Sequence, residues 1–395
     1  MDNVNFIKRT WAEININALE HNYKVIRNHV QPHSKICCVV KADGYGHGAV
    51  EVAKTFDTLG TDWFAVSNIE EALQLRQNGI NKPLLILGYT PPNLSALLSK
   101  NNISQAVYSL DYAEEISEDA VKHGVNIKIH LKIDTGMSRI GLMYQDFDRD
   151  EASINEAKKI CSLKNIIPEG VFTHFAVSDE ADEGKDFTKC QFERFVHAVN
   201  LLESAGVNFE IRHCANSGGV IDYPEMHLDM VRAGIILYGL APSAKLKGKL
   251  NLIPAMELKS VVSQVKKIEQ GTTVSYGRAF TADSTKQIAT IPTGYADGYT
   301  RDLAGKASVQ IFGQRAAVVG RVCMDQLMSD VTNIKNVKRG DIITLFGSGT
   351  DGAPTADDIA AWSNTINYEV TCLIGKRVAR VYLQNGKIVA TSTLR

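Results

Sequence analysis

Between residues 32 and 240, short apolar runs alternate with longer amphipathic segments, and this alternation restricts the fold more than any other feature of the sequence. The runs have the length of buried strands, whereas the segments between them place apolar residues at helical spacing. Eight runs occur, at residues 36–40, 63–67, 83–88, 105–109, 127–134, 170–175, 209–214 and 228–234. Eight strand–helix units of this size predict a (β/α)₈ TIM barrel rather than a doubly wound sheet.

The sequence after residue 245 has a different pattern. Its segments are short, rich in β-branched residues and often alternating, and Asn385-Gly386 between two such arms is a strong hairpin signal. Only residues 355–366 have a helical pattern, with Thr355 and Asp358 placed as a capping box. We therefore expect an α/β barrel domain over residues 1–245 and a mainly β domain over residues 246–395. The first strand of the chain is free to pack with the second domain.

Composition and charge exclude several classes of protein. Lys plus Arg number 43 against 44 for Asp plus Glu, so no basic excess points to a nucleic-acid partner. No apolar segment approaches the roughly 18 residues that span a bilayer, and the N-terminus lacks the pattern of a secretory signal. The seven cysteines include no CxxC pair and the ten histidines no HExxH, so we expect neither a disulfide framework nor a metal site. These features predict a cytoplasmic protein with no membrane or nucleic-acid partner.

The segment GSGTDG, residues 347–352, matches the glycine pattern of dinucleotide-binding loops. The expected helix begins only after Thr355, too late for the third glycine to pack against its first turn. Too few residues follow for half of a dinucleotide-binding domain. We therefore interpret this segment as a turn, and a nicotinamide-dependent oxidoreductase is disfavoured.

Several predicted barrel strands end in polar side chains. These are Lys41, Lys132, His174, His213 (with Asn216 and Ser217 close behind) and Arg232. A single residue of this kind is usually a solvated strand boundary. In a barrel, however, the C-terminal strand ends carry the chemistry, so a set that converges on one rim predicts an active site.

A lysine at an apolar barrel mouth is easily desolvated, which lowers its pKa and makes it a nucleophile toward an aldehyde. Pyridoxal phosphate is the aldehyde that this chemistry suggests. Its phosphate needs donors, and the loops after strands seven and eight are the usual phosphate site of a barrel. Residues 215–219 and 232–236 lie there and have small side chains that let backbone N–H groups approach a phosphate.

The chain contains, in this order, the motifs VVKADGYGHG, KIDTGMSRIG, THFAVSDE, HCANSGG, MVRAGIILYG, VSYG, GYADGY and GRVCMDQ. Together these motifs resemble those of the alanine racemases, a family of fold-type III pyridoxal-phosphate enzymes. The resemblance covers essentially the whole chain and both expected domains. It implies a homodimer with shared active sites that interconverts L-alanine and D-alanine by a two-base mechanism. The D-alanine would serve peptidoglycan synthesis.

The resemblance also implies the catalytic roles. Lys41 would bind the cofactor through an imine and act as base on one face of the substrate. Tyr276 of the second subunit would be the opposite base, and His213, linked to Arg232, would draw off its proton. Arg232 would face the pyridine nitrogen. Because arginine keeps its proton, it would donate a hydrogen bond without protonating the ring, which favours simple proton exchange.

Further positions are assigned by the same resemblance. Contacts to the cofactor are implied for Tyr45, Arg139, His174, Asn216, Ser217, Gly234 and Ile235. The substrate carboxylate would be held by Arg139 and Met324. Lys132 is either a carbamylated lysine that orients Arg139 or an ordinary buried lysine. A narrow access corridor would be lined by Tyr295, Arg301, Arg321 and Asp179.

One position departs from the family pattern. Lys376 stands in CLIGKRVAR where many relatives have a tyrosine that contacts the phosphate and limits substrate size. Serine, or several amino acids, therefore stays open as an alternative to alanine. A decarboxylase of basic amino acids is disfavoured because its ring-nitrogen partner is typically acidic. A non-catalytic pyridoxal-phosphate binder is disfavoured because such single-barrel proteins lack a β domain.

Overall fold

The chain divides into two compact parts in a computed structural model that describes residues 6–393. The barrel unit comprises Glu20–Gly44 and Val52–Leu252. The β unit comprises the described residues up to Leu19, the segment Tyr45–Glu51 and the described residues from Ile253 on. The short segment Tyr45–Glu51 therefore groups with the β unit, although it directly follows the first barrel strand.

Eight parallel strands form the barrel, and each of the eight predicted runs contains or overlaps one of them. In the order in which they pair they are β10 (Met230–Ala233), β2 (Lys35–Val39), β3 (Trp63–Val66), β4 (Leu84–Ile86), β5 (Ile103–Val107), β6 (Ile127–Asp134), β8 (Ile166–Phe172) and β9 (Ile211–His213). Between β9 and β10 the Asp229 N–H donates to the Arg212 carbonyl at 3.2 Å, and the Arg232 N–H donates to Ala215 at 2.9 Å. These bonds nearly close the ring, so the barrel prediction is confirmed.

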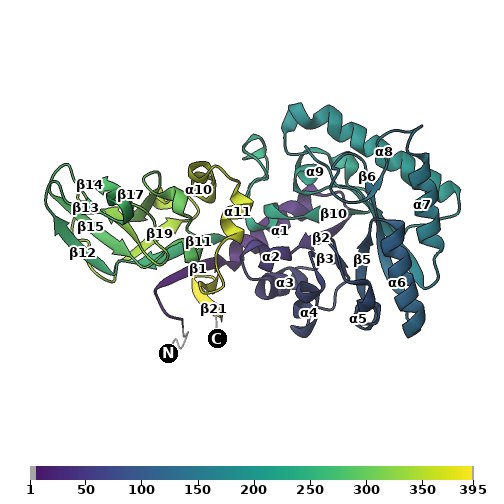
Figure 1. The fold of residues 1–395 in the computed structure, drawn as a ribbon, viewed down its shortest axis with the longest axis horizontal. Coiled ribbons are helices and arrows are strands. Elements are labelled where there is room, and N and C mark those ends of the chain that lie inside the picture. The colour runs from purple at the N-terminus through teal and green to yellow at the C-terminus, as the bar shows by residue number, and fades with distance from the viewer. Residues whose placement is uncertain (1–5, 394–395) are drawn as a thin grey trace. The chain divides into compact units, whose positions relative to one another are not determined.

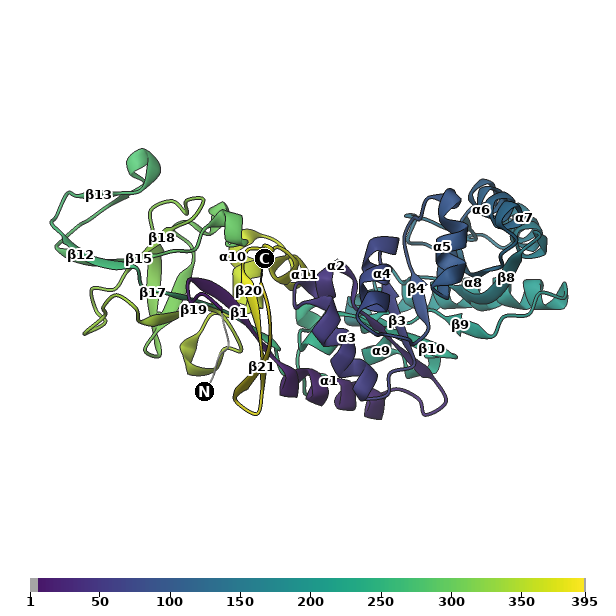
Figure 2. The same ribbon diagram turned by 90° about the horizontal axis from the view of Figure 1, so that it is seen from below.

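Helices cover the outside of the barrel, as Figures 1 and 2 show for α4 to α7. They are α1 (Ile16–His29), α3 (Ala49–Thr58), α4 (Ile69–Gln77), α5 (Ser95–Lys100), α6 (Leu110–His123), α7 (Glu151–Ser162), α8 (Lys185–Ser204) and α9 (Ser217–Asp222). Each longer helix buries one stripe. In α6, for example, Tyr112, Ile116 and Ala120 recur at four-residue spacing and are all buried.

The β unit is built on a ten-stranded sheet. Its strands, in pairing order, are β12 (Gln264–Ile268), β15 (Lys286–Ile291), β18 (Leu327–Asp330), β17 (Gln314–Val319), β16 (Ser308–Ile311), β19 (Ile342–Phe346), β11 (Met256–Val261), β1 (Thr10–Asn15), β20 (Ala379–Gln384) and β21 (Lys387–Ser392). The first strand of the chain thus pairs with β11 and β20. Asn385 and Gly386 both have positive φ and connect β20 to β21, as the hairpin prediction requires.

Helix α10 (Ala356–Ser363) begins with the predicted capping box of Thr355 and Asp358. Residues 347–352 are a turn in which Thr350–Gly352 form a single 3-10 turn, so the interpretation of GSGTDG as a turn is confirmed. A second short helix, α11 (Asn367–Cys372), was not predicted. It has only six residues and no capping side chain, and its sequence NYEVTC carries no helical periodicity.

In the part of the chain that the structure describes, no helix is long and apolar enough to cross a membrane.

Gly46 and Gly48 follow the first barrel strand, and both have no room for a side chain. A Cβ on Gly46 would lie 2.0 Å from the Thr371 carbonyl oxygen, and one on Gly48 would lie 1.8 Å from the Tyr382 hydroxyl. Both glycines also have positive φ. The glycines of the GYGHG loop are therefore needed for close packing within the β unit as well as for the bend.

We expect Gly46→Ala to lower the free energy of unfolding by about 1–3 kcal/mol more than Gly271→Ala. The two glycines share a φ of +81°, but no heavy atom lies within 4 Å of the Cβ position at Gly271. The backbone strain is thus matched, and the difference isolates the contact with Thr371. Denaturant unfolding of the two full-length variants measures it, and equal losses would show that the loop moves aside freely.

Candidate functional site

Lys41 opens a left-handed turn, α2 (Lys41–Tyr45), directly after β2. Ala42, Asp43, Gly44 and Tyr45 have φ of 52°, 52°, 62° and 52°. For residues other than glycine this conformation costs about 1–2 kcal/mol each, so it persists only where other contacts hold it. The Gly44 N–H donates to the Val40 carbonyl at 2.9 Å. Lys41 itself is half-buried, at the position where the strand ends and this turn begins.

Glu71 holds this turn from outside. Its carboxylate, on α4, accepts the Ala42 N–H at 2.6 Å and the Ser67 N–H at 2.8 Å. It therefore ties the ends of the first two barrel strands together beside Lys41. Sequence analysis missed Glu71, because a glutamate in the first turn of a helix is ordinary there.

Arg232 lies near the C-terminal end of β10 and is 3% exposed. Its Nη1 contacts His213 Nδ1 at 2.8 Å, and its Nη2 contacts His174 Nδ1 at 3.2 Å. The same Nη2 donates to the carbonyls of Thr173 at 2.8 Å and Cys214 at 3.1 Å. Burial lowers the pKa of Arg232 to about 10, so the group stays charged at neutral pH. The predicted link between His213 and Arg232 is confirmed.

Both histidines beside Arg232 are held neutral. Burial first, and then the charge of Arg232, lowers the pKa of His174 and of His213 well below the ordinary value. Since a guanidinium only donates, the Nδ1 atom of each ring is an acceptor and its Nε2 carries the proton. The Nε2 of His213 is already bonded to His130 at 2.9 Å. Both ring nitrogens of His213 thus have partners within the barrel unit, and its role in drawing off the proton of Tyr276 stays a prediction.

Phe172 forms a platform that sequence analysis did not identify. Strand pairing places Lys132, Phe172 and His213 side by side across β6, β8 and β9, which puts their side chains on the same face. The ring of His213 stacks on Phe172 with centroids 4.9 Å apart and planes 6° apart. Lys132 Nζ and the Arg232 guanidinium lie 5.7 Å and 5.4 Å from the centroid of Phe172. One aromatic ring therefore fixes three of the predicted site residues.

Lys132 is 3% exposed, and its ammonium donates to the Ile133 carbonyl at 2.9 Å. Burial, opposed in part by Asp134 and reinforced by Arg232, lowers the pKa of Lys132 to about 7. A large fraction of this amine is therefore neutral near pH 7. A neutral buried amine is nucleophilic, as carbamylation by CO₂ requires.

The loop that carries Arg139 is anchored by Asp134. One oxygen of this buried carboxylate accepts the backbone N–H groups of Gly136, Met137 and Ser138 at 2.9–3.0 Å. The loop therefore leaves β6 in a defined direction, and Arg139 lies exposed at its end.

Two loops meet at the predicted phosphate position. The Gly234 N–H, after β10, donates to the Ser217 hydroxyl, after β9, at 3.0 Å. A Cβ on the adjacent Gly218 would lie 2.8 Å from the backbone of Ser178, so only glycine fits there. Asn216 caps α9 through the Gly219 N–H and is bonded to Ser178 at 2.7 Å. The side chain of Asn216 thus stabilises the conformation of this loop.

Tyr276 lies on an arm of the β unit formed by β13 (Thr273–Val274) and β14 (Phe280–Thr281), which Figure 2 shows extending away from the other strands of that unit. The tyrosine is 70% exposed. Neighbouring Ser275 donates to the Arg321 carbonyl at 2.8 Å. The arm is thereby tied to the segment that contains Met324.

That segment also holds the loop of Tyr295. The Tyr295 N–H donates to the Cys323 carbonyl at 3.0 Å, and the Ala296 N–H donates to Met324 at 3.1 Å. Tyr295 and Met324 are 42% and 53% exposed, unusually high for large apolar side chains. The β unit therefore gathers three predicted site residues on hydrogen-bonded segments and leaves all three accessible.

The remaining predicted residues divide between the units. Tyr45 is buried within the β unit, with its ring 6.0 Å from that of Tyr368, and burial raises its pKa, so it stays a phenol. Lys376, Arg301 and Arg321 also belong to the β unit, whereas Asp179 and Ile235 belong to the barrel unit. Among residues 6–393 no group of three or more His, Cys, Asp or Glu is placed to hold a metal ion.

Comparison with known proteins gives matches along the whole chain. Residues 14–242 match the family description "Alanine racemase, N-terminal domain", and residues 255–382 match "Alanine racemase, C-terminal domain". The chain is 46% identical to the alanine racemase of Desulfovibrio desulfuricans, over 96% of this chain and all of that protein. It is also 46% identical to the alanine racemase of Clostridium tetani, over 97% of each.

Solved structures give the same result. An alanine racemase of Clostridium difficile 630 superposes with a TM-score of 0.92 at 43% identity, over 98% of this chain and 99% of that one. The alanine racemase of Bacillus anthracis with bound L-Ala-P superposes with a TM-score of 0.91 at 32% identity, over 98% of each chain.

The low pKa of Lys132 predicts a pH-dependent contribution to stability. In the unfolded chain this lysine takes up a proton below about pH 10.5, but in the folded protein only below about pH 7. Relative to Lys132→Met, the wild type should therefore gain unfolding free energy as pH rises from about 7 to 10, by up to about 1.4 kcal/mol per pH unit. Denaturant unfolding in CO₂-free buffer measures this difference.

Lys159→Met, which removes an exposed lysine of α7, is the matched control and should show no such slope. A wild type that runs parallel to Lys132→Met between pH 7 and 10 would mean that Lys132 stays charged when folded.

Proposed function

Because the chain belongs to the alanine racemase family, we propose that Lys41 and Tyr276 are the two proton carriers with which it interconverts L-alanine and D-alanine. The observation that carries this assignment is the charged guanidinium of Arg232, which has four hydrogen-bond partners at the end of the barrel where Lys41 follows β2. Such a rim suits a reaction in which a proton leaves one face of Cα and returns to the other. The family depends on pyridoxal 5′-phosphate, and so does this enzyme.

The residues of the barrel unit fit that cofactor. The Nε–H of Arg232 has no acceptor within residues 6–393, so it would be available to the pyridine nitrogen. Ser217, Gly234 and Ile235 would hold the phosphate where the loops after β9 and β10 meet. When bound, pyridoxal phosphate supplies an electron-withdrawing ring that stabilises negative charge on the substrate Cα.

Lys41 would hold the cofactor until the substrate amine takes its place, and the Nζ released in this way would then exchange a proton with one face of the substrate. The left-handed turn restricts where its side chain can start, and Glu71 holds that turn in place. A base restricted in this way keeps its orientation toward one face only, which a stereochemically defined proton transfer needs.

Tyr276 would serve the opposite face. A tyrosine of ordinary pKa near 10 is a poor base at neutral pH, so a donor must stabilise its phenolate. His174 suits this role better than His213. Its Nδ1 contacts Arg232, so its Nε2–H remains available to donate to a phenolate oxygen.

Arg232 would direct the outcome of the reaction. It stays charged at neutral pH and donates a hydrogen bond, but it does not give the ring nitrogen a full proton. The ring is then a weaker electron sink than it would be beside a carboxylic acid. This difference favours proton exchange over decarboxylation or transamination.

Arg139 and Met324 would hold the substrate carboxylate. Carbamylation of Lys132 would turn a buried amine into an anion that can pair with Arg139. The pKa of about 7 for Lys132 supports this modification, because CO₂ reacts with the neutral amine.

We further propose a homodimer in which each site combines Lys41 of one subunit with Tyr276 of a partner subunit. Tyr276, Tyr295 and Met324 are exposed together on the β unit although they are large and largely apolar. Exposed apolar groups that cluster mark interaction surfaces more often than scattered ones do. A partner subunit would cover this cluster and use it.

Alanine is the substrate, and serine acceptance is the second candidate. Lys376, which stands where many relatives have a tyrosine, is exposed within the β unit. A flexible lysine excludes a larger side chain less strictly than an aromatic ring does.

All seven cysteines are free thiols, which favours a reducing compartment such as the cytoplasm as the location.

Lys41→Ala should lose both racemisation and the cofactor bond that borohydride reduces. Chiral chromatography of L-alanine incubations measures the activity, and mass spectrometry after reduction locates the bound cofactor. Lys35→Ala, at the other end of β2, is the control and should retain both. Cofactor found on another lysine of the wild type would refute the assignment of Lys41.

Tyr276→Phe should bind the cofactor normally and slow proton removal from L-alanine more than from D-alanine. Proton incorporation in D₂O, followed in both directions, measures this asymmetry. Equal losses in the two directions would contradict the assignment of Tyr276 to one face.

A mixed dimer of Lys41→Ala and Tyr276→Phe chains should regain one working site of two. An active monomer would refute the sharing of sites.

A further inference from the structure

A chain of hydrogen bonds runs through the barrel interior, from Arg232 at the C-terminal rim toward the opposite end. Arg232 Nη1 lies 2.8 Å from His213 Nδ1, and His213 Nε2 lies 2.9 Å from His130 Nδ1. His130 Nε2 then lies 3.3 Å from Glu169 Oε2. Glu169 also accepts from the Ser104 hydroxyl, and from Lys128 Nζ at 2.7 Å. Only the Arg232 end of this chain belongs to the proposed catalytic machinery.

Strand pairing places these groups at successive levels of the barrel. His213 pairs with Phe172 at the upper level, and His130 pairs with Gly170 two residues lower on β6 and β8. Lys128 lies a further two residues toward the N-terminal end of β6. The chain of bonds therefore follows the barrel axis and crosses between levels.

The backbone around Glu169 is irregular, and this irregularity places Glu169 in the series of hydrogen bonds. The pairing of β6 with β8 shifts between Ile129 and His130, so β8 has an extra residue, Glu169, between Pro168 and Gly170. An extra residue of this kind redirects a side chain, and here Glu169 is turned into a site where it is 6% exposed. A Cβ on Gly170 would lie 2.5 Å from His130 Nδ1, so the absence of a side chain makes room for the imidazole.

Arg232 and Glu169, at the two ends of this series of hydrogen bonds, fix the direction of every bond between them. Arg232 only donates, so His213 Nδ1 accepts and, in the neutral ring, its Nε2 carries the proton. That proton points to His130 Nδ1, which must accept, so the proton of His130 is on Nε2 and points to Glu169. A carboxylate only accepts, and the chain ends there without conflict. Burial lowers the pKa of His130 and of His213, in keeping with two neutral rings.

We propose that Glu169 and His130 are positioning residues for the reaction. They hold His213 as the Nε2–H tautomer and so keep its Nδ1 as the acceptor that orients Arg232. This inference rests on the proposed role of Arg232 toward the cofactor ring. Without the carboxylate, the buried Nε2–H of His130 has no acceptor, and the ring gains by moving its proton to Nδ1. His213 must then give up its bond to His130 or its bond to Arg232.

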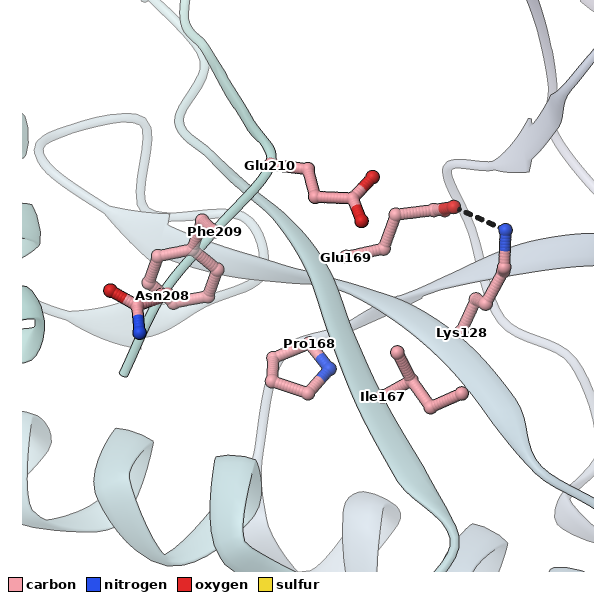
Figure 3. A pocket seen from close by; sticks show the side chains of 7 residues that line it. All are labelled: Lys128, Ile167, Pro168, Glu169, Asn208, Phe209 and Glu210. Atoms are coloured by element: carbon pink, nitrogen blue, oxygen red, sulfur yellow. Dashed lines mark hydrogen bonds and ion pairs between the residues drawn. The ribbon is translucent and has the colours of Figure 1, made fainter. Parts of the chain in front are cut away.

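The Glu169 end of this series of hydrogen bonds lies at a surface cavity of about 390 Å³. The cavity is lined by Lys128, Ile167, Pro168, Glu169, Asn208, Phe209 and Glu210. Figure 3 shows the ion pair of Lys128 with Glu169 there, and Glu210 extending toward the same carboxylate. Lys128 is 44% exposed in its side chain, so removing it leaves the buried acceptor in place. Burial acts to raise the pKa of Glu169, but hydrogen bonds from His130, Lys128 and Ser104 outweigh it and lower that pKa to about 2.

The test is ¹⁵N NMR of the histidine rings in the full-length holoenzyme, with His130 and His213 assigned through His130→Gln and His213→Gln. In the wild type both rings should be neutral Nε2–H tautomers. Glu169→Met should shift His130 toward the Nδ1–H tautomer and lower kcat by about tenfold or more, as loss of a partner that orients a functional histidine does. Lys128→Met and Glu169→Gln, which each keep an acceptor for His130, should leave both tautomers unchanged.

A wild-type His213 with its proton on Nδ1, or a charged His130, would overturn the proposal at once. So would unchanged tautomers and unchanged kcat in Glu169→Met. If that variant fails to fold, the wild-type spectrum and Glu169→Gln still decide the direction of the bonds. Because the tautomers are read without turnover, the proposal can fail or hold independently of the roles assigned to Lys41 and Tyr276.

Discussion

The buried guanidinium of Arg232 is the group on which the rest of the site depends. It has four partners within the barrel unit, all of which accept hydrogen bonds, and it stays charged because its lowered pKa is still about 10. Its charge helps to lower the pKa of His174 and of His213, so both rings are neutral, and each accepts from it through Nδ1. In the proposed role of Arg232, this permanent donor would give the cofactor ring a hydrogen bond and not a proton. The choice of arginine thus connects the packing of the barrel core with the type of reaction.

The features that position side chains at the C-terminal rim of the barrel also lower the local stability of the fold. The turn after β2 places residues other than glycine in the left-handed region, and the interior of the barrel holds a lysine, an arginine and two histidines where apolar side chains would pack more simply. Glu71, Phe172 and Asp134 compensate by fixing the turn, the ring stack and the Arg139 loop. The proton carrier proposed for the other face, Tyr276, lies instead on an exposed arm of the β unit. Such an arm suits a residue that is completed by a partner subunit.

The fold could be predicted because each barrel strand is a short apolar run and each longer helix buries one periodic stripe. Short elements such as α11 and the arm of β13 and β14 were missed, because two to six residues carry no periodicity. Motifs located Lys41, Arg232 and His213, and the structure confirms that His213 meets Arg232. They could not show that His130 occupies the second nitrogen of His213, since that contact joins residues 83 positions apart. Glu169-Gly170 within a strand was the one available signal, because a charge followed by glycine there is typical of a bulge.

Neutron diffraction from a deuterium-exchanged crystal would show the direction of each bond between Arg232 and Glu169, because it places the hydrogen atoms themselves. We expect a fully deuterated Arg232, with deuterium on Nε2 and none on Nδ1 of His213 and of His130, and an unprotonated Glu169. Deuterium on Nδ1 of His213, or on a carboxylate oxygen of Glu169, would contradict it, because the bonds would then not run from the arginine to the glutamate.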